Sequence, residues 1–110
     1  MSGVASRPLT PARTRQLTLR WVNRVRAGHR LGAPLAELPA GWGGSCDCPI
    51  AIALSDLEAG RQAHVGLTNA RIIGGGSNGL DDVRLQLPWA AQAFIALFDD
   101  GVYPDLLRGR

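Results

Sequence analysis

Two cysteines and two histidines are the side chains of this 110-residue sequence best suited to binding a metal: Cys46, Cys48, His29 and His64. Structural zinc sites usually carry two pairs of ligands, with two to four residues between the members of a pair. Here one residue separates the cysteines, and the histidines stand 17 residues before Cys46 and 16 residues after Cys48. This spacing argues against zinc, and we expect neither a metal nor a cofactor.

Cys48 could instead act as a nucleophile. It directly precedes Pro49, and the dipole of a helix that begins here would favour the thiolate form of the cysteine. Nucleophilic catalysis would still need a positioned base. His29 and His64 are the available imidazoles, and nothing in the sequence places either beside Cys48. We therefore expect a structural cysteine and a protein that is not an enzyme.

A glycine-rich segment at residues 74–79 could bind phosphate. A P-loop needs a lysine followed by serine or threonine, and this sequence contains no lysine. A dinucleotide fingerprint needs glycines that open a helix, whereas the segment here leads into a predicted strand. We interpret residues 74–79 as a hairpin loop.

Two pairs of adjacent carboxylates, Asp81–Asp82 and Asp99–Asp100, could bind a hard cation or act as acid and base. No further motif surrounds either pair. The second pair falls at the C-terminal end of a predicted helix, where the helix dipole disfavours anions. We expect Asp99 and Asp100 to form salt bridges with arginines of the first helix.

The basic residues are unevenly distributed. All 12 are arginine, and the net charge is +3. Residues 1–36 contain seven arginines and no acid, whereas residues 37–110 contain five arginines and nine acids, so the two parts carry +7 and −4. This asymmetry favours a polyanion partner, because arginine binds phosphate through paired hydrogen bonds. The basic segment could equally dock on the acidic remainder of its own chain. The candidate nucleic-acid contacts are Arg13, Arg15, Arg20, Arg24, Arg26 and Arg30.

These arginines lie on a predicted helix over residues 11–27. Thr10 is a suitable N-cap, Pro11 suits the first helical position, and Gly28 ends the helix. One face is apolar, with Leu17, Trp21, Val22 and Val25 at helical spacing. The polar face carries Arg13, Gln16, Arg20, Asn23 and Arg24.

The remaining pattern predicts five further elements. After a long connection over residues 28–44, in which Trp42 folds back on the core, Pro49 opens a second helix that Gly60 ends. The buried side of that helix is expected to hold Ile50, Ala53, Leu54 and Leu57. Strands follow over residues 63–67 and 70–73, and a third over 83–87, where apolar and polar residues alternate.

A third helix over residues 89–98 completes the order α-α-β-β-β-α. Its predicted apolar face consists of Ala90, Ala93, Phe94, Leu97 and Phe98. We expect Val83, Leu85 and Leu87 to point inward and pack on this helix. The fold class is then α+β, with helices packed on a short antiparallel sheet.

Length and composition are consistent with one small domain over residues 11–110, preceded by a flexible arm over residues 1–10. Hydrophobic residues make up 45% of the chain, without a continuous apolar run of the length that spans a membrane. Residues 1–16 show no signal peptide. We therefore expect a cytoplasmic protein whose cysteines are reduced thiols.

Two segments carry a family resemblance. Residues 48–54, with the pattern CPIAxAL, and residues 88–106, which end in FIxxFDxGxYPxL, resemble small uncharacterised proteins of actinobacteria and their phages. The resemblance spans about residues 38–107 and implies a bacterial or phage accessory protein of the cytoplasm. That group has no established activity, and the basic first helix lies outside the matched part.

The sequence therefore favours a small non-enzymatic binding module. Its arginine-rich helix would contact the backbone of DNA or RNA with little sequence specificity, since no helix-turn-helix spacing or stacking aromatic is present. The alternative is a protein-interaction module that binds a host protein or a second copy of itself. Apolar residues outside the main stripes support it: Trp42, Ile52, Trp89 and Ile95. No membrane and no small-molecule substrate is expected.

Overall fold

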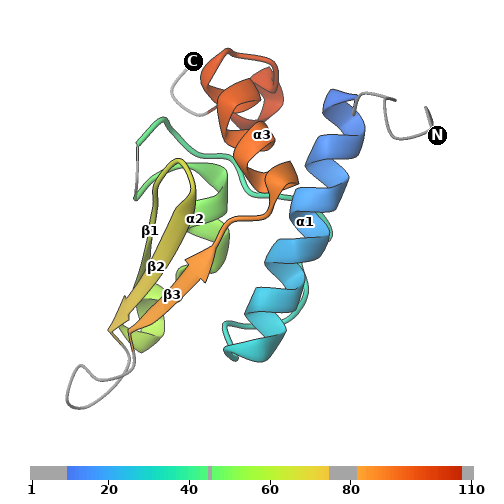
Figure 1. Cartoon of the computed structure of the whole chain (residues 1–110). Helices are drawn as coiled ribbons and strands as arrows, with labels where there is room; N and C mark the ends of the chain where they lie inside the picture. The colour runs from blue at the N-terminus through green and yellow to red at the C-terminus, as the bar shows by residue number, and fades with distance from the viewer. Residues whose placement is uncertain (1–9, 45, 75–81, 108–110) are drawn as a thin grey trace.

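The computed structural model describes residues 10–44, 46–74 and 82–107. Three α-helices and three strands follow the predicted order (Figure 1). They are α1 (Pro11–Gly28), α2 (Pro49–Leu54), β1 (Arg61–Val65), β2 (Asn69–Gly74), β3 (Val83–Gln86) and α3 (Trp89–Asp99), with short 3-10 turns η2 (Leu57–Ala59) and η3 (Pro104–Leu106). The α+β fold class is confirmed. The predictions for residues 1–9, most of the glycine-rich segment and Asp81 fall outside the described residues.

Helix α1 begins and ends close to its predicted limits. The Thr10 hydroxyl accepts a hydrogen bond from the backbone N–H of Arg13 at 3.1 Å, and Pro11 occupies the first turn. The helix continues through Gly28, and the N–H of His29 donates to the carbonyl of Val25. These are the capping interactions that the Thr10–Pro11 pair predicts.

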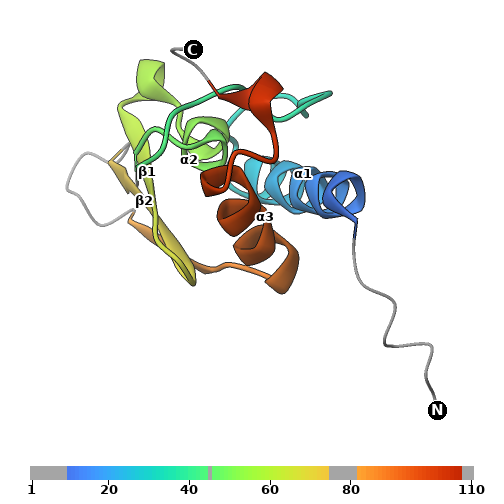
Figure 2. The ribbon, with the colours of Figure 1, turned by 90° about the horizontal axis from the view of Figure 1, so that it is seen from above.

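The buried face of α1 differs from the predicted one. Leu17, Trp21 and Val25 are only half-buried, and the fully enclosed side chains lie further round the helix. Those buried residues are Thr14, Thr18, Val22 and Arg26. The reason is the contact with α3, where the Thr18 hydroxyl lies 2.8 Å from the carbonyl oxygen of Thr14 and 3.2 Å from that of Ala90. Threonines with satisfied hydroxyls let α1 and α3 pack closely side by side (Figure 2).

Helix α2 is shorter than predicted. Cys48 is its N-cap, with Sγ accepting from the N–H of Ala51, and Pro49 starts the first turn as expected. The helix stops at Leu54 because the Ser55 hydroxyl donates to the carbonyl of Ala51 at 2.7 Å and accepts from the N–H of Ala63 at 2.8 Å. This bridge turns the chain toward β1. Leu57, predicted to be buried, is consequently 73% exposed in η2.

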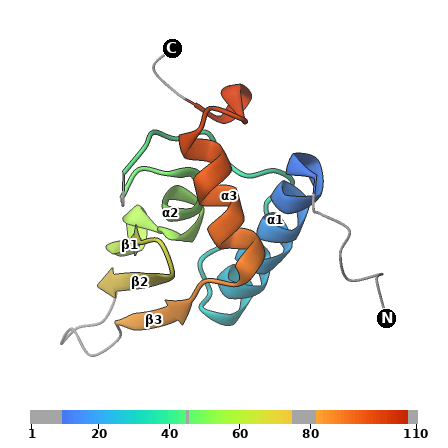
Figure 3. The same ribbon diagram turned by 45° about the horizontal axis from the view of Figure 1, so that its top comes forward.

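The three strands form one antiparallel sheet in the order β1-β2-β3. Cross-strand pairs such as Ala63 with Ile72 and Val65 with Ala70 point to the covered side. Figure 3 shows the three helices on this one side of the sheet. We call the opposite side the open face. Period-2 alternation places Arg71 and Arg84 there in solvent, whereas His64 is half-buried beside the loop before α2.

The end of β3 leads directly into the core. Leu87 is 1% exposed, whereas Val83 and Leu85 are only partly buried against the same cluster, because β3 is the last strand of the sheet. On α3 the buried side chains are Ala91, Phe94, Ile95 and Phe98, so Ile95 belongs to the core rather than to the surface. The Phe94 ring stacks on Phe98 and on Tyr103.

The long connection between α1 and α2 is held by its backbone. The N–H of Gly41 donates to the carbonyl of Leu106, and that of Trp42 donates to the carbonyl of Asp47. The Trp42 ring is 44% exposed, so the prediction that it folds back into the core is wrong. The backbone bonds fix the loop without burying the ring. Within the described residues, no helix is long and apolar enough to cross a membrane.

Candidate nucleic-acid interface

The six arginines proposed as contacts separate into buried and exposed groups, and Arg26 is the clearest buried case. It is 9% exposed, and its Nη1 donates to the carbonyl of Ala53 at 2.7 Å. Its Nη2 and Nε donate to the carbonyl of Ala33 at 2.9 and 3.2 Å. A side chain at Gly32, where φ is +129°, would collide with this guanidinium. Arg26 is therefore a structural residue, and its assignment to a phosphate-binding surface is wrong.

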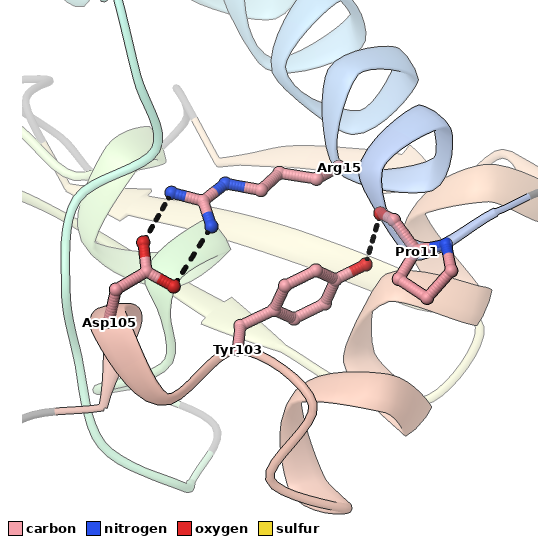
Figure 4. Close-up of polar contacts among 4 residues, drawn as sticks. All are labelled: Pro11, Arg15, Tyr103 and Asp105. Carbon is pink, nitrogen blue, oxygen red and sulfur yellow. Dashed lines mark hydrogen bonds and ion pairs between the residues drawn. The ribbon is translucent and has the colours of Figure 1, made fainter.

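Arg15 is held by the C-terminal part of the chain (Figure 4). Its Nη1 and Nη2 donate to the two carboxylate oxygens of Asp105 at 3.1 and 2.8 Å, and its guanidinium lies over the Tyr103 ring. The Tyr103 hydroxyl donates to the carbonyl of Pro11 at 2.7 Å. The hydrogen bonds from Arg15 lower the pKa of Asp105, whereas burial raises the pKa of Tyr103.

The sequence left open that the basic helix docks on the acidic remainder of its own chain. The pair between Arg15 and Asp105 is one such contact. The predicted partners Asp99 and Asp100 do not take part, because both are exposed at the end of α3 and neither pairs with an arginine in the described structure. η3 brings Asp105 to Arg15 instead.

Three arginines of α1 remain on its outer face. Arg13, Arg20 and Arg24 are exposed and follow one line along the helix, opposite the buried face that contains Thr18 and Val22. Because a helix rises 1.5 Å per residue, the line extends over about 16 Å. We call Arg13, Arg20 and Arg24 the α1 arginine stripe. Among the described residues, none of the three forms an ion pair, and the Arg13 guanidinium donates to the amide oxygen of Gln16 at 3.4 Å.

Arg30 lies just beyond the end of α1 and is also exposed. Its φ of +54° is left-handed, a conformation that carries the chain out of the helix after His29. Arg30 thus extends the basic surface at the C-terminal end of the α1 arginine stripe.

A second basic surface cannot be predicted from the sequence alone, because it depends on strand register. His64 is paired with Arg71, and Arg71 with Arg84, in one row across the open face of the sheet. Arg71 and Arg84 are exposed, and a carboxylate oxygen of Asp82 lies 4.0 Å from Arg71 Nη2. The alternation of apolar and polar residues over 83–87 predicts that Arg84 faces outward. Only the pairing of the strands shows that Arg84 lies in one row with Arg71 and His64.

The potential metal ligands are not gathered into a site. In the described part of the chain, no three cysteine, histidine or acidic side chains could hold a metal ion. Cys48 is buried, and that burial raises the pKa of its thiol, in agreement with a structural role. His64, however, lies beside the other cysteine, with Nδ1 3.2 Å from Cys46 Sγ. In the sequence, His64 is a candidate base for Cys48, and no spacing there connects it to Cys46; the folded chain brings these two side chains together.

The fold and the arginine surfaces define a small α+β protein with a basic outer helix. Comparison of the chain with family models, curated proteins and solved structures finds no match. The resemblance to small actinobacterial and phage proteins accordingly stays a prediction.

Proposed function

We propose that this protein is a non-enzymatic cytoplasmic module that binds the phosphate backbone of DNA or RNA through the α1 arginine stripe. One observation carries the proposal: Arg13, Arg20 and Arg24 are exposed in a line and pair with no described carboxylate. Arginines that are not neutralised internally remain available for phosphates, whose binding releases counterions from the nucleic acid.

Little sequence specificity follows from the side chains beside the stripe. Base recognition commonly uses the amides of asparagine and glutamine. The Asn23 amide is occupied, since its Nδ2 donates to the carbonyl of Leu35 and its Oδ1 accepts from the N–H of Leu35. The Gln16 oxygen accepts from Arg13. Apart from the arginines, which can also read guanine, the outer face of α1 therefore offers few groups for base edges, and its cations suit phosphates.

The test is the salt dependence of binding to a short duplex, measured by fluorescence anisotropy. Three phosphate contacts predict a slope of about −2.7 for log K against log salt concentration. The double variant R20Q/R24Q should reduce the magnitude of this slope by about 1.8, because it removes two contacts. Glutamine retains good helix propensity, so the variant should stay folded.

The matched control removes the same charge from the open face of the sheet. The variant R71Q/R84Q changes two exposed arginines on β2 and β3 and leaves the α1 arginine stripe intact. We expect it to keep the slope of the wild type. Equal losses in both variants would show that net charge alone governs binding, and the absence of binding at low salt would contradict the proposal.

The alternative to nucleic-acid binding is protein interaction, and it is supported by exposed apolar side chains. Leu67 is 77% exposed and Trp89 67% exposed, and a hydrogen bond from the N–H of Leu87 to the carbonyl of Thr68 joins the segments that carry them. Exposed apolar surface of this kind is typical of partner-binding sites. If the chain binds no nucleic acid but its mass in solution rises with concentration, self-association through this surface becomes the better account.

A further inference from the structure

The contact between Cys46 and His64 is a pair of reactive groups outside the arginine surfaces. Cys46 lies in the loop before α2, and His64 projects from β1 on the open face of the sheet. The Cys46 sulfur is 3.2 Å from Nδ1 of His64 and 3.9 Å from Nε2. At the shorter distance the imidazole can accept the thiol proton, which is the arrangement that activates cysteine nucleophiles.

Cys46 also borders a cleft. Cys46 is partly exposed and lines a cavity of about 400 Å³ together with Trp42, Ile52, Ser55 and Leu57. Much of the surface of the Trp42 ring and the Leu57 side chain is open to solvent. A small molecule in this cleft would lie beside Cys46 and rest against apolar side chains.

The charged groups around the pair come from the loop and from β2. Arg71 is the cross-strand neighbour of His64 on the open face, where paired side chains lie about 5 Å apart at Cβ. Arg71 is exposed, and its Nη2 lies 4.0 Å from a carboxylate oxygen of Asp82. Asp47 follows Cys46 in the chain and is exposed as well, so solvent screens the charges of both residues. Helix α2, which packs below the loop, carries no ionisable side chain.

Cys48 provides an internal comparison two residues away. Its sulfur is buried, caps α2 by accepting from the N–H of Ala51, and has a raised pKa because of burial. A buried thiol of this kind is unreactive. Cys48 also borders a cleft, of about 250 Å³, but its side chain is buried there. Of the two cysteines, Cys46 is the one with an imidazole beside its sulfur in the described structure.

We propose that Cys46 is a modification site that exchanges with the disulfide of a low-molecular-weight thiol. His64 takes the thiol proton, and the Cys46 thiolate attacks one sulfur of the small disulfide. The Cys46–sulfur bond forms as the disulfide bond breaks. The departing thiolate takes its proton from the His64 imidazolium, so that the products are a mixed disulfide on Cys46 and one free small thiol.

The experiment incubates the full chain with glutathione disulfide at pH 7 and follows the intact mass with time. The wild type and C48S should each gain one glutathione at similar rates, whereas C46S should gain none. The variant H64Q should react about three- to tenfold more slowly at pH 7, because an unassisted thiol is only a few per cent ionised there. At about pH 9.5 its rate should approach that of the wild type, because thiols ionise without a base above their ordinary pKa.

The pH comparison separates base assistance from a merely structural role of His64. If H64Q were only to distort the loop, its rate would stay altered at both pH values. Modification of Cys48 in place of Cys46, or a wild-type rate for H64Q at pH 7, would overturn the proposal. Circular dichroism of each variant checks that the fold is intact. The result is independent of nucleic-acid binding, which uses α1.

Discussion

Replacing Arg26 with methionine tests whether this arginine is part of the folded core. The substitution keeps a long unbranched side chain with nearly the same helix propensity, so α1 itself is not weakened. It removes the guanidinium that donates to the carbonyls of Ala53 and Ala33 at 2.7 to 3.2 Å. R26M therefore removes the donor from the carbonyl of buried Ala53 and from the carbonyl of Ala33, an exposed residue.

The expected loss follows from these contacts. A hydrogen bond from a charged donor contributes about 1.5–3 kcal/mol, and two carbonyl partners are affected. Burying the charged guanidinium costs desolvation free energy in the wild type. R26M removes this cost, which offsets part of the lost stability. We expect R26M to reduce the free energy of unfolding by about 2–4 kcal/mol, a large fraction of the stability of a small domain.

The matched control is R24M, two residues earlier on the exposed face of α1. It should change the free energy of unfolding by less than about 0.5 kcal/mol, as surface substitutions usually do. Urea unfolding followed by circular dichroism measures both variants. The denaturation midpoint should fall for R26M with an unchanged slope. Similar stabilities for R26M and R24M would refute the assignment of Arg26 to the core.

Two further substitutions test the sheet edge and the Arg15–Asp105 pair. Leu87 is fully buried and Leu85 only partly, so L87A should cost about 2–5 kcal/mol in urea unfolding and L85A clearly less; the reverse order would contradict the burial described here. Asp105 is 61% exposed, so D105N should cost less than about 1 kcal/mol at neutral pH. Because Arg15 lowers the pKa of Asp105, the pair stabilises the fold above the ordinary carboxyl pKa and loses this effect as pH falls through the lowered value. The stability difference between D105N and the wild type should therefore disappear in strong acid, and a difference that grows with acid would contradict this reasoning.

Local sequence signals were sufficient for the order of the elements and for the starting points of the helices, whereas β1 and β2 begin one or two residues before their predicted starts. Thr10–Pro11 and Cys48–Pro49 each place an N-cap before a proline, and the structure contains both helix starts. Capping depends on neighbours in the chain, so it can be predicted without the tertiary fold. The end of α2 could not be predicted in this way, because Ser55 stops the helix through a hydrogen bond from the N–H of Ala63 on β1.

The sequence also determined that the first helix is basic, but it could not determine which arginines are free. Arg24 and Arg26 are the same residue type two positions apart, and the helical period places them on different faces. Leu17, Trp21 and Val25 suggested one orientation of α1. Packing on α3 selected another, because the threonine face allows the closer approach of the two helices.

The reactive pair was decided by tertiary structure alone. Cys46 and His64 are 18 residues apart in the sequence, and no local spacing rule connects them. They meet because the loop before α2 passes over β1 and because strand register turns His64 to the open face. A period of two tells which residues share a face, but only the folded sheet decides which face the helices cover and which loop lies beside it.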